Sequence, residues 1–95
     1  MDKYSFNLYI TGDSLSSKEI ISNINNTFEN HFNDNFTVYV IDVLHEPELA
    51  KKHKIFVTPT LVKLSPKPVK SVIGDFSSQE KVLCALNTLI ENKNK

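Results

Sequence analysis

The single cysteine, Cys84, limits the thiol chemistry open to this chain. A dithiol mechanism needs two cysteines, typically as Cys-x-x-Cys at a helix start, where the helix dipole and free amides lower the thiol pKa. The turn after the first predicted strand, residues 11–17, contains no sulfur. Cys84 falls beside the apolar stripe of the last predicted helix, which favours a buried, unreactive thiol. The sequence therefore excludes dithiol catalysis, and an enzyme that uses Cys84 alone is the least favoured hypothesis.

No other combination of residues predicts catalysis. The three histidines have no spacing with Asp, Glu or Cys that suggests a metal site, and surface positions are expected for them (His31, His45 and His53). Asp42 could serve as a general base, but a lone carboxylate is more often a loop anchor. The two glycines form no phosphate-binding loop. We therefore expect no catalytic residue, metal or cofactor.

Lysine supplies all the basic charge. The chain has 11 Lys, no Arg and a net charge of zero, so it lacks the bidentate guanidinium contacts typical of nucleic-acid readers, and no nucleic-acid partner is expected. Six lysines fall in a stretch without acids: Lys51, Lys52, Lys54, Lys63, Lys67 and Lys70. From the residues alone, this stretch is more typical of a solvated face than of a binding patch.

Length and composition predict one folded domain, residues 1–95. Hydrophobic residues make up 40% of the chain and charged residues 23%, which suits a folded core. No apolar run approaches the ~20 residues of a membrane helix, and the first residues have no signal-peptide pattern, so we expect no membrane partner and a cytoplasmic location. A domain this small has modest stability, and a homo-oligomer is plausible.

The first half of the sequence predicts a βαβ unit. Residues 4–10 alternate between apolar and more polar side chains, as in a strand. Ser16 and Glu19 form a capping box that opens an amphipathic helix running to about Phe32. Residues 36–43 are β-branched or aromatic on both faces, which predicts a central buried strand. A parallel pairing of these strands makes the helix a right-handed crossover.

The second half predicts a short helix, a hairpin and a final helix. Pro47 suits the first turn of the short helix. Two strands, 61–64 and 69–73, are expected to pair as the hairpin. Pro59 precedes the first strand, and its peptide bond is either cis or trans.

A second capping box, Ser77 and Glu80, opens the last helix. Its apolar stripe comprises Val82, Leu83, Leu86, Leu89 and Ile90. The tail from Glu91 is polar. The resulting order, βαβαββα, is that of the thioredoxin fold, and a fold alone does not give a function.

A series of short motifs resembles the KaiB family of circadian-clock proteins. It runs in order through nearly the whole chain: Leu8–Gly12, Val40–Val43, Pro47-x-Leu49-Ala50, Lys54-Ile55, Thr58–Leu61, Pro68-Val69, Ile73–Asp75 and Glu80–Leu83.

The resemblance implies a non-enzymatic regulator that binds a hexameric ATPase of the KaiC type, with KaiA-like proteins or clock histidine kinases as further partners. It implies that the six lysines above include partner contacts, since Lys54, Lys63 and Lys70 stand where the family carries basic residues. An alternative hypothesis is a stand-alone adaptor similar to the N-terminal domain of the clock histidine kinase SasA.

The resemblance also implies a second, tetrameric form of order βαββααβ, so that a dimer or tetramer is expected. The backbone positions expected to govern the change are Pro59, Pro66, Pro68, Gly74, Ala85 and Asn87. Two departures stand out: the family's Gly-Leu-Asp is Ala85-Leu86-Asn87 here, and its Arg-Arg is Lys70-Ser71. Because Ala is favoured over Gly inside a helix by about 1 kcal/mol, we predict that this chain populates the thioredoxin-like form more than clock members do.

Overall fold

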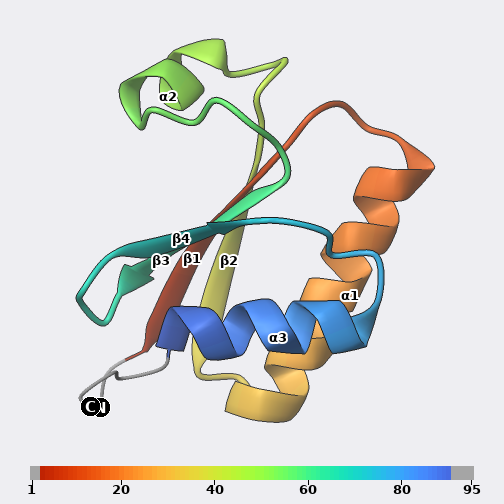
Figure 1. Ribbon diagram of the computed structural model, residues 1–95, viewed down its shortest axis with the longest axis vertical. Coiled ribbons are helices and arrows are strands. Elements are labelled where there is room, and N and C mark those ends of the chain that lie inside the picture. Colours follow the sequence, from red (N-terminus) through yellow and green to blue (C-terminus); the bar gives the residue numbers. More distant parts are fainter. Residues whose placement is uncertain (1–2, 91–95) are drawn as a thin grey trace.

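The computed structural model describes residues 3–90, and Figure 1 shows seven elements in the predicted order βαβαββα. They are β1 (Tyr4–Ile10), α1 (Leu15–Phe32), β2 (Phe36–Asp42), α2 (Pro47–Lys52), β3 (Thr60–Ser65), β4 (Lys70–Ile73) and α3 (Gln79–Ile90). The predicted polar tail from Glu91 lies outside the described residues.

The four strands form one sheet in the order β2-β1-β3-β4. β1 and β2 pair in parallel, which confirms α1 as their crossover, and β3 and β4 form the predicted antiparallel hairpin. β3 also pairs antiparallel with β1, so β1 occupies the interior of the sheet. Residues 6–10 of β1 are buried on both faces, more fully than their alternating pattern suggested.

The prediction that residues 36–43 form a central strand was wrong. β2 ends at Asp42 and lies at an edge of the sheet, with Tyr39 58% and Val40 43% exposed. β-branched and aromatic residues favour strands in general, so such a run does not distinguish an edge strand from an interior one. β2 lies at the edge because β3 pairs with β1 and not with β2.

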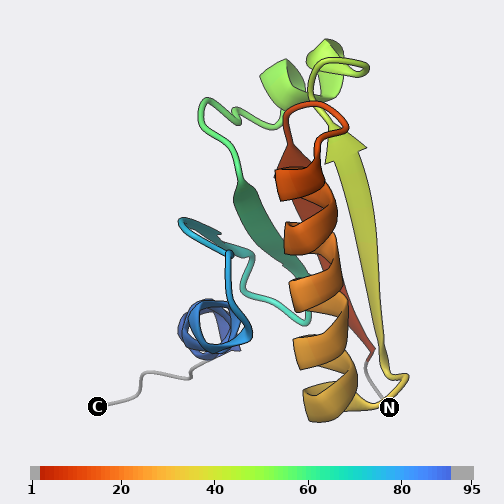
Figure 2. The ribbon, with the colours of Figure 1, turned by 90° about the vertical axis from the view of Figure 1, so that its right-hand side faces the viewer.

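Both long helices pack on one face of the sheet. α3 crosses α1 steeply in Figure 1 and is seen almost end-on in Figure 2. The core between these helices and the sheet includes Phe6 and Leu8 from β1, Phe28 from α1 and Leu86 from α3. The rings of Phe6 and Phe28 lie 4.6 Å apart. This core joins the two halves of the sequence.

Both predicted capping boxes were displaced. The N-cap of α1 is Ser14, whose hydroxyl accepts a hydrogen bond from the Ser17 amide at 3.1 Å. At the start of α3 the Ser78 hydroxyl accepts from the Lys81 amide at 3.2 Å. Several serines stand near each helix start, and any of them can serve as an N-cap. The serine pattern therefore predicted that a helix begins there but did not identify its first residue.

The apolar stripe of α3 is confirmed at Val82, Leu86 and Leu89, which are fully buried. Leu83 lies outside it and is exposed, while Ala85 is buried. Cys84 is also exposed, so the prediction of a buried thiol was wrong. The stripe is narrower than predicted because only one side of α3 faces the sheet.

A smaller cluster packs on the opposite face of the sheet. It joins Tyr9, Ile41 and Val62 to Leu49 and Ile55, which lie in and after α2. This cluster holds α2 at the end of the sheet where β1 and β2 finish, at the top of Figure 1. We call this end the apex.

Candidate partner-binding surface

Asp42 ties together the first two loops of the apex. Its Oδ1 accepts hydrogen bonds from the backbone amides of Gly12 at 2.9 Å and Leu44 at 3.0 Å. These two bonds, with the Gly12 amide first, hold the pKa of Asp42 below its ordinary value. Gly12 has φ +78°, a conformation that glycine adopts without strain. Asp42 is therefore a loop anchor, as its isolation in the sequence favoured.

Tyr9 fastens the end of α2 to the sheet. Its hydroxyl accepts a hydrogen bond from the Asn7 amide at 3.1 Å and lies 2.6 Å from Nδ1 of His53, to which it is placed to donate. Tyr9 is buried and His53 is exposed, so the bond joins the interior of the sheet to the surface of the apex. The other two histidines, His31 and His45, are exposed as predicted.

The end of α2 is a Schellman motif with a lysine in the place that usually holds glycine. The amide of Ile55 donates to the Ala50 carbonyl at 2.8 Å, and that of Lys54 to the Lys51 carbonyl at 3.2 Å. Lys54 takes φ +59°, a left-handed conformation that costs a non-glycine residue about 1–2 kcal/mol. The turn directs the chain back toward β3.

The segment before β3 is held by threonines. The Thr11 and Thr58 hydroxyls are hydrogen-bonded to each other across two loops, and the Thr60 hydroxyl donates to the Val57 carbonyl. The Thr58–Pro59 bond is cis, which answers the question that the sequence left open, and the bonds preceding Pro66 and Pro68 are cis as well. All the loops of the apex are thus tied to one another or to the sheet.

These tied loops present large apolar side chains to solvent. Leu15, the first residue of α1, is 80% exposed, and Phe56, in the loop before β3, is 86% exposed. Leu44, in the loop after β2, and Val57, next to Phe56, are exposed as well. With the exposed lysines of α2 and its C-terminal turn, they make up what we call the apical surface: Leu15, Leu44, Lys51, Lys52, Lys54, Phe56 and Val57. Further exposed apolar side chains lie on β2, the β3–β4 hairpin and α3. A large exposed apolar side chain such as Phe56 is a candidate anchor for an interaction site. Sequence analysis missed the apolar members, although apolar residues outside every periodic element were the signal.

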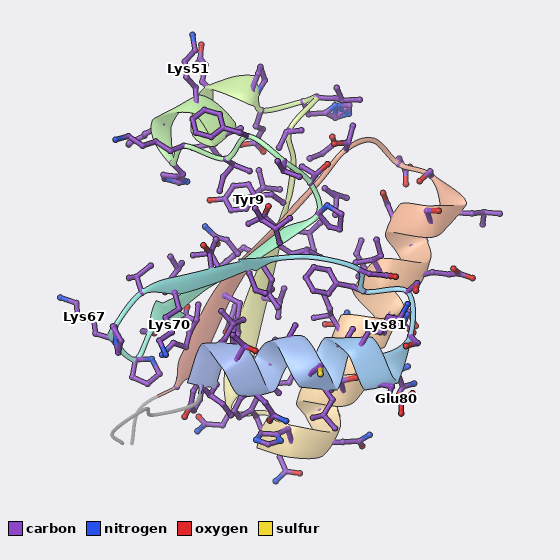
Figure 3. The ribbon with its side chains drawn as sticks, in the orientation of Figure 1. Tyr9, Lys51, Lys67, Lys70, Glu80 and Lys81 are labelled. Atoms are coloured by element: carbon purple, nitrogen blue, oxygen red, sulfur yellow. The ribbon has the colours of Figure 1, made fainter. Side chains whose placement is uncertain are left out.

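The structure separates the six lysines that the sequence placed in one stretch. Lys51, Lys52 and Lys54 belong to the apical surface, whereas Lys67 and Lys70 lie on the β3–β4 hairpin at the other end of the sheet (Figure 3). The predicted basic stretch is therefore two groups at opposite ends of the sheet, and both adjoin exposed apolar residues: Phe56 and Val57 near the first, Val69 and Ile73 near the second.

Lys63 belongs to neither group. It lies in β3 opposite Lys70 and is only 4% exposed. Burial lowers the pKa of Lys63, and the neighbouring charge of Lys70 lowers it further. The partner contact that the resemblance implied for Lys63 stays a prediction, and in this structure the side chain is covered.

The described residues hold no cluster of metal-ligating side chains. Residues 3–90 contain no group of three or more His, Cys, Asp or Glu side chains that could hold a metal ion. Cys84, the one cysteine of the chain, lies on α3, far along the sequence from the turn of residues 11–17. Within the same part of the chain, no helix combines the length and apolar character needed to cross a membrane.

These features define a class: a thioredoxin-like domain whose first turn has no thiol pair and whose apex is a rigid, partly apolar surface. The chain belongs to the KaiB family, since the profile of the KaiB domain matches residues 7–88. It is 43% identical to the circadian clock protein KaiB3 of Synechocystis sp. over 96% of this chain and 89% of that protein. It is also 43% identical to the circadian clock oscillator protein KaiB of Cyanothece sp., over 93% of this chain and 84% of that protein.

Solved structures agree on the fold. The N-terminal domain of Synechococcus elongatus SasA superposes with a TM-score of 0.73, at 19% identity and covering 93% of this chain and 83% of that one. The thioredoxin Deadhead of Drosophila melanogaster gives a TM-score of 0.69, at 22% identity over 94% and 83% of the two chains. At these identities the likeness shows the thioredoxin-like fold alone.

Proposed function

We propose that this protein is a non-catalytic clock-type regulator that binds an ATPase ring of the KaiC type through its apical surface. Membership of the KaiB family and relatives named as circadian clock proteins support the clock role. The observation that carries the docking surface is the exposure of Phe56, on a segment tied by the Thr11–Thr58 hydrogen bond, and of Leu15, the first residue of α1.

The physical argument rests on preorganisation. A surface whose loops are already ordered loses little conformational entropy on binding, and buried aromatic anchors supply much of an interface's energy. Lys51, Lys52 and Lys54 lie on α2 and the turn that leads to Phe56, and would steer an acidic partner surface. The hairpin also exposes Val69 and Ile73 beside Lys67 and Lys70, but no exposed aromatic side chain, which makes it the weaker candidate.

Co-migration with a purified KaiC homologue, with and without ATP, tests the proposal. The wild-type protein should form a complex, and Phe56→Ser should weaken it by about tenfold or more, as loss of an interface anchor does. Phe56 is so exposed that this change should leave the fold intact, which circular dichroism checks. Lys54→Glu should weaken the complex, while Lys67→Glu, a matched control at the far end of the sheet, should not.

Two results would contradict the proposal. Absence of a complex with the wild-type protein in both nucleotide states would refute the partner. A complex that Lys67→Glu weakens and Phe56→Ser leaves unchanged would refute the apical surface. The elution volume of the protein alone would also test the expected homo-oligomer, and the same column run with KaiA-like proteins or clock histidine kinases would test those partners.

We further infer that the thioredoxin-like form is favoured by the composition of α3. Ala85 is buried within this helix and Asn87 is exposed on it, at positions where the family carries Gly and Asp. The helical state of residues 79–90 agrees with the preference of Ala over Gly. NMR can measure the fraction of molecules in a second, tetrameric form, because two slowly exchanging forms give separate sets of signals. We expect the signals of the thioredoxin-like form to dominate.

A further inference from the structure

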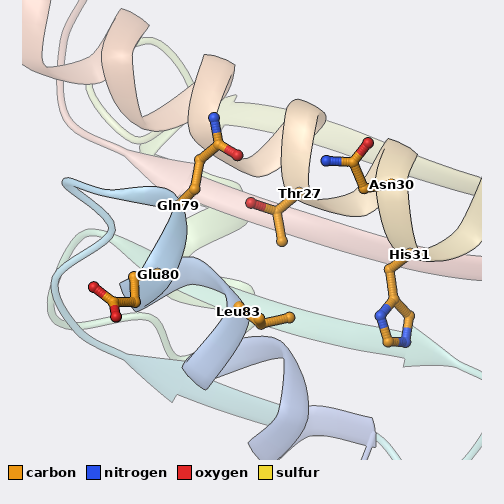
Figure 4. A pocket seen from close by; sticks show the side chains of 6 residues that line it. All are labelled: Thr27, Asn30, His31, Gln79, Glu80 and Leu83. Carbon is orange, nitrogen blue, oxygen red and sulfur yellow. The ribbon is translucent and has the colours of Figure 1, made fainter.

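A groove of about 360 Å³ runs between α1 and α3, on the helical side of the domain and away from the residues of the apical surface. Its volume falls within the range of small-ligand sites. In Figure 4 the side chain of Gln79 on α3 reaches toward α1, whereas the carboxylate of Glu80, near the start of α3, is turned away from Thr27. The six lining residues are Thr27, Asn30, His31, Gln79, Glu80 and Leu83.

The floor of this α1–α3 groove carries an unpaired hydroxyl. Thr27 is only 6% exposed, and its Oγ1 has no hydrogen-bond partner among the described residues. A helical threonine usually bonds to the carbonyl four residues back, but Thr27 does not. In Figure 4 its oxygen points across the groove toward Gln79. A buried hydroxyl without a partner is unfavourable, so it marks a place where a binding group is missing.

The charged side chains around the groove indicate which kind of ligand group it can bind. Glu80 is the one carboxylate among its lining residues, which also include the His31 imidazole, and it forms no ion pair with any described residue. The adjacent Lys81 is bound to Asp75 at 2.7 Å, and no lysine lines the groove. An anion would therefore meet a carboxylate and no lysine. A purely apolar group would leave the Thr27 hydroxyl unpaired.

The remaining groups are rich in acceptors. The Thr27 hydroxyl and the amide oxygens of Asn30 and Gln79 come from both walls, and the Glu80 carboxylate lies at the edge of the groove, turned outward in Figure 4. An ammonium group concentrates three donors at one point, whereas a guanidinium group spreads five across a plane and can reach acceptors on two sides. Exposed Leu83 would cover the methylene stem that carries the guanidinium.

We propose that the α1–α3 groove binds the side chain of an arginine presented by a partner protein. This chain contains no arginine, so a second copy of it cannot supply the group. The proposal stands apart from docking at the apical surface and is tested without any ATPase.

The test uses three small probes on the isotope-labelled full-length protein. Nα-acetyl-arginine methylamide should shift the backbone NMR signals of Thr27, His31 and residues 79–83, with saturation in the millimolar range. The lysine analogue and the citrulline analogue, which keeps the shape of arginine but not its charge, should each bind about fivefold or more weakly, because a hydrogen bond to a charged group is stronger than a neutral one.

Variants assign the response to this groove. Thr27→Val and Glu80→Gln should each weaken arginine binding by about threefold or more, in line with loss of a single hydrogen bond. The matched controls are Thr88→Val, whose hydroxyl is already bonded to the Cys84 carbonyl, and Glu48→Gln on α2. Both controls should bind arginine as the wild type does.

Three outcomes would overturn the proposal. Equal responses to arginine, lysine and citrulline would show that the groove does not select a guanidinium. Shifts confined to other parts of the chain would place the site elsewhere. An undiminished response in Thr27→Val would show that the hydroxyl is satisfied by an ordered water and takes no part in binding.

Discussion

Replacing Thr27 by valine should stabilise the protein, an unusual outcome for a substitution in a buried position. Valine has the shape of threonine with a methyl group in place of the hydroxyl, and the two residues have similar helix propensities. Burying a hydroxyl without a partner costs about 1–3 kcal/mol, and a buried methyl group contributes about 0.8 kcal/mol. We expect a net gain in unfolding free energy of about 1–2 kcal/mol.

Urea denaturation followed by circular dichroism measures this change directly. The urea midpoint should rise without a change in the slope, because the surface exposed on unfolding stays the same. The melting temperature should rise by about 4–8 °C for each kcal/mol in a domain of this size. Thr88→Val is the control: its hydroxyl donates to the Cys84 carbonyl at 3.2 Å on the exposed side of α3, so its stability should change by about 0.5 kcal/mol or less.

A Thr27→Val protein that is no more stable than the wild type would refute the reasoning. It would mean that the hydroxyl has a partner in solution, either a water molecule in the groove or a carbonyl of α1. The premise of an unpaired group, on which the arginine site depends, would then fail together with the stability prediction.

Four further predictions follow from the apex and from α3. Lys54→Gly should raise the unfolding free energy by about 1 kcal/mol in urea titrations, because glycine adopts the positive φ without strain, while weakening the ATPase complex through loss of the charge. Asp42→Ala should lower the urea midpoint at neutral pH. Because the pKa of Asp42 is depressed in the folded state, this difference is present above about pH 4 and should shrink as the pH falls through the folded-state pKa. Tyr9→Phe should cost about 1–3 kcal/mol, since it leaves two partners unpaired, whereas Tyr39→Phe on the exposed edge should cost little in the same assay. Ala85→Gly should cost about 1 kcal/mol by calorimetry, and an unchanged melting temperature would count against the importance of α3 composition.

The sequence was sufficient for the order of elements because each signal was local. Alternation in residues 4–10, helical spacing up to Phe32 and the prolines around the hairpin all act within a few positions of the chain. The helix starts were less exact. Several neighbouring serines can cap a helix, and the choice of Ser14 depends on how Gly12 and Asp42 shape the loop before it.

Features set by strand order and packing could not be read from the sequence. The edge position of β2 depends on where β3 pairs, and β3 begins 18 residues after β2 ends. The division of the lysines depends on α2 and the hairpin lying at opposite ends of the sheet. The unpaired Thr27 hydroxyl depends on the approach of α3 to α1. Each of these properties is long-range, so residue type and spacing along the chain do not contain it.

The edge strand β2 has a consequence for the protein in a crowded cell. Its seven residues contain no proline or lysine and a single charge, Asp42, and its outer backbone groups face no other strand of the sheet. Natural edge strands usually carry such residues to prevent unwanted pairing. An edge without them can accept a strand from any chain that presents one. Aggregation through this edge should therefore increase with protein concentration. A bound protein that covers this edge would therefore also act as its protection against aggregation.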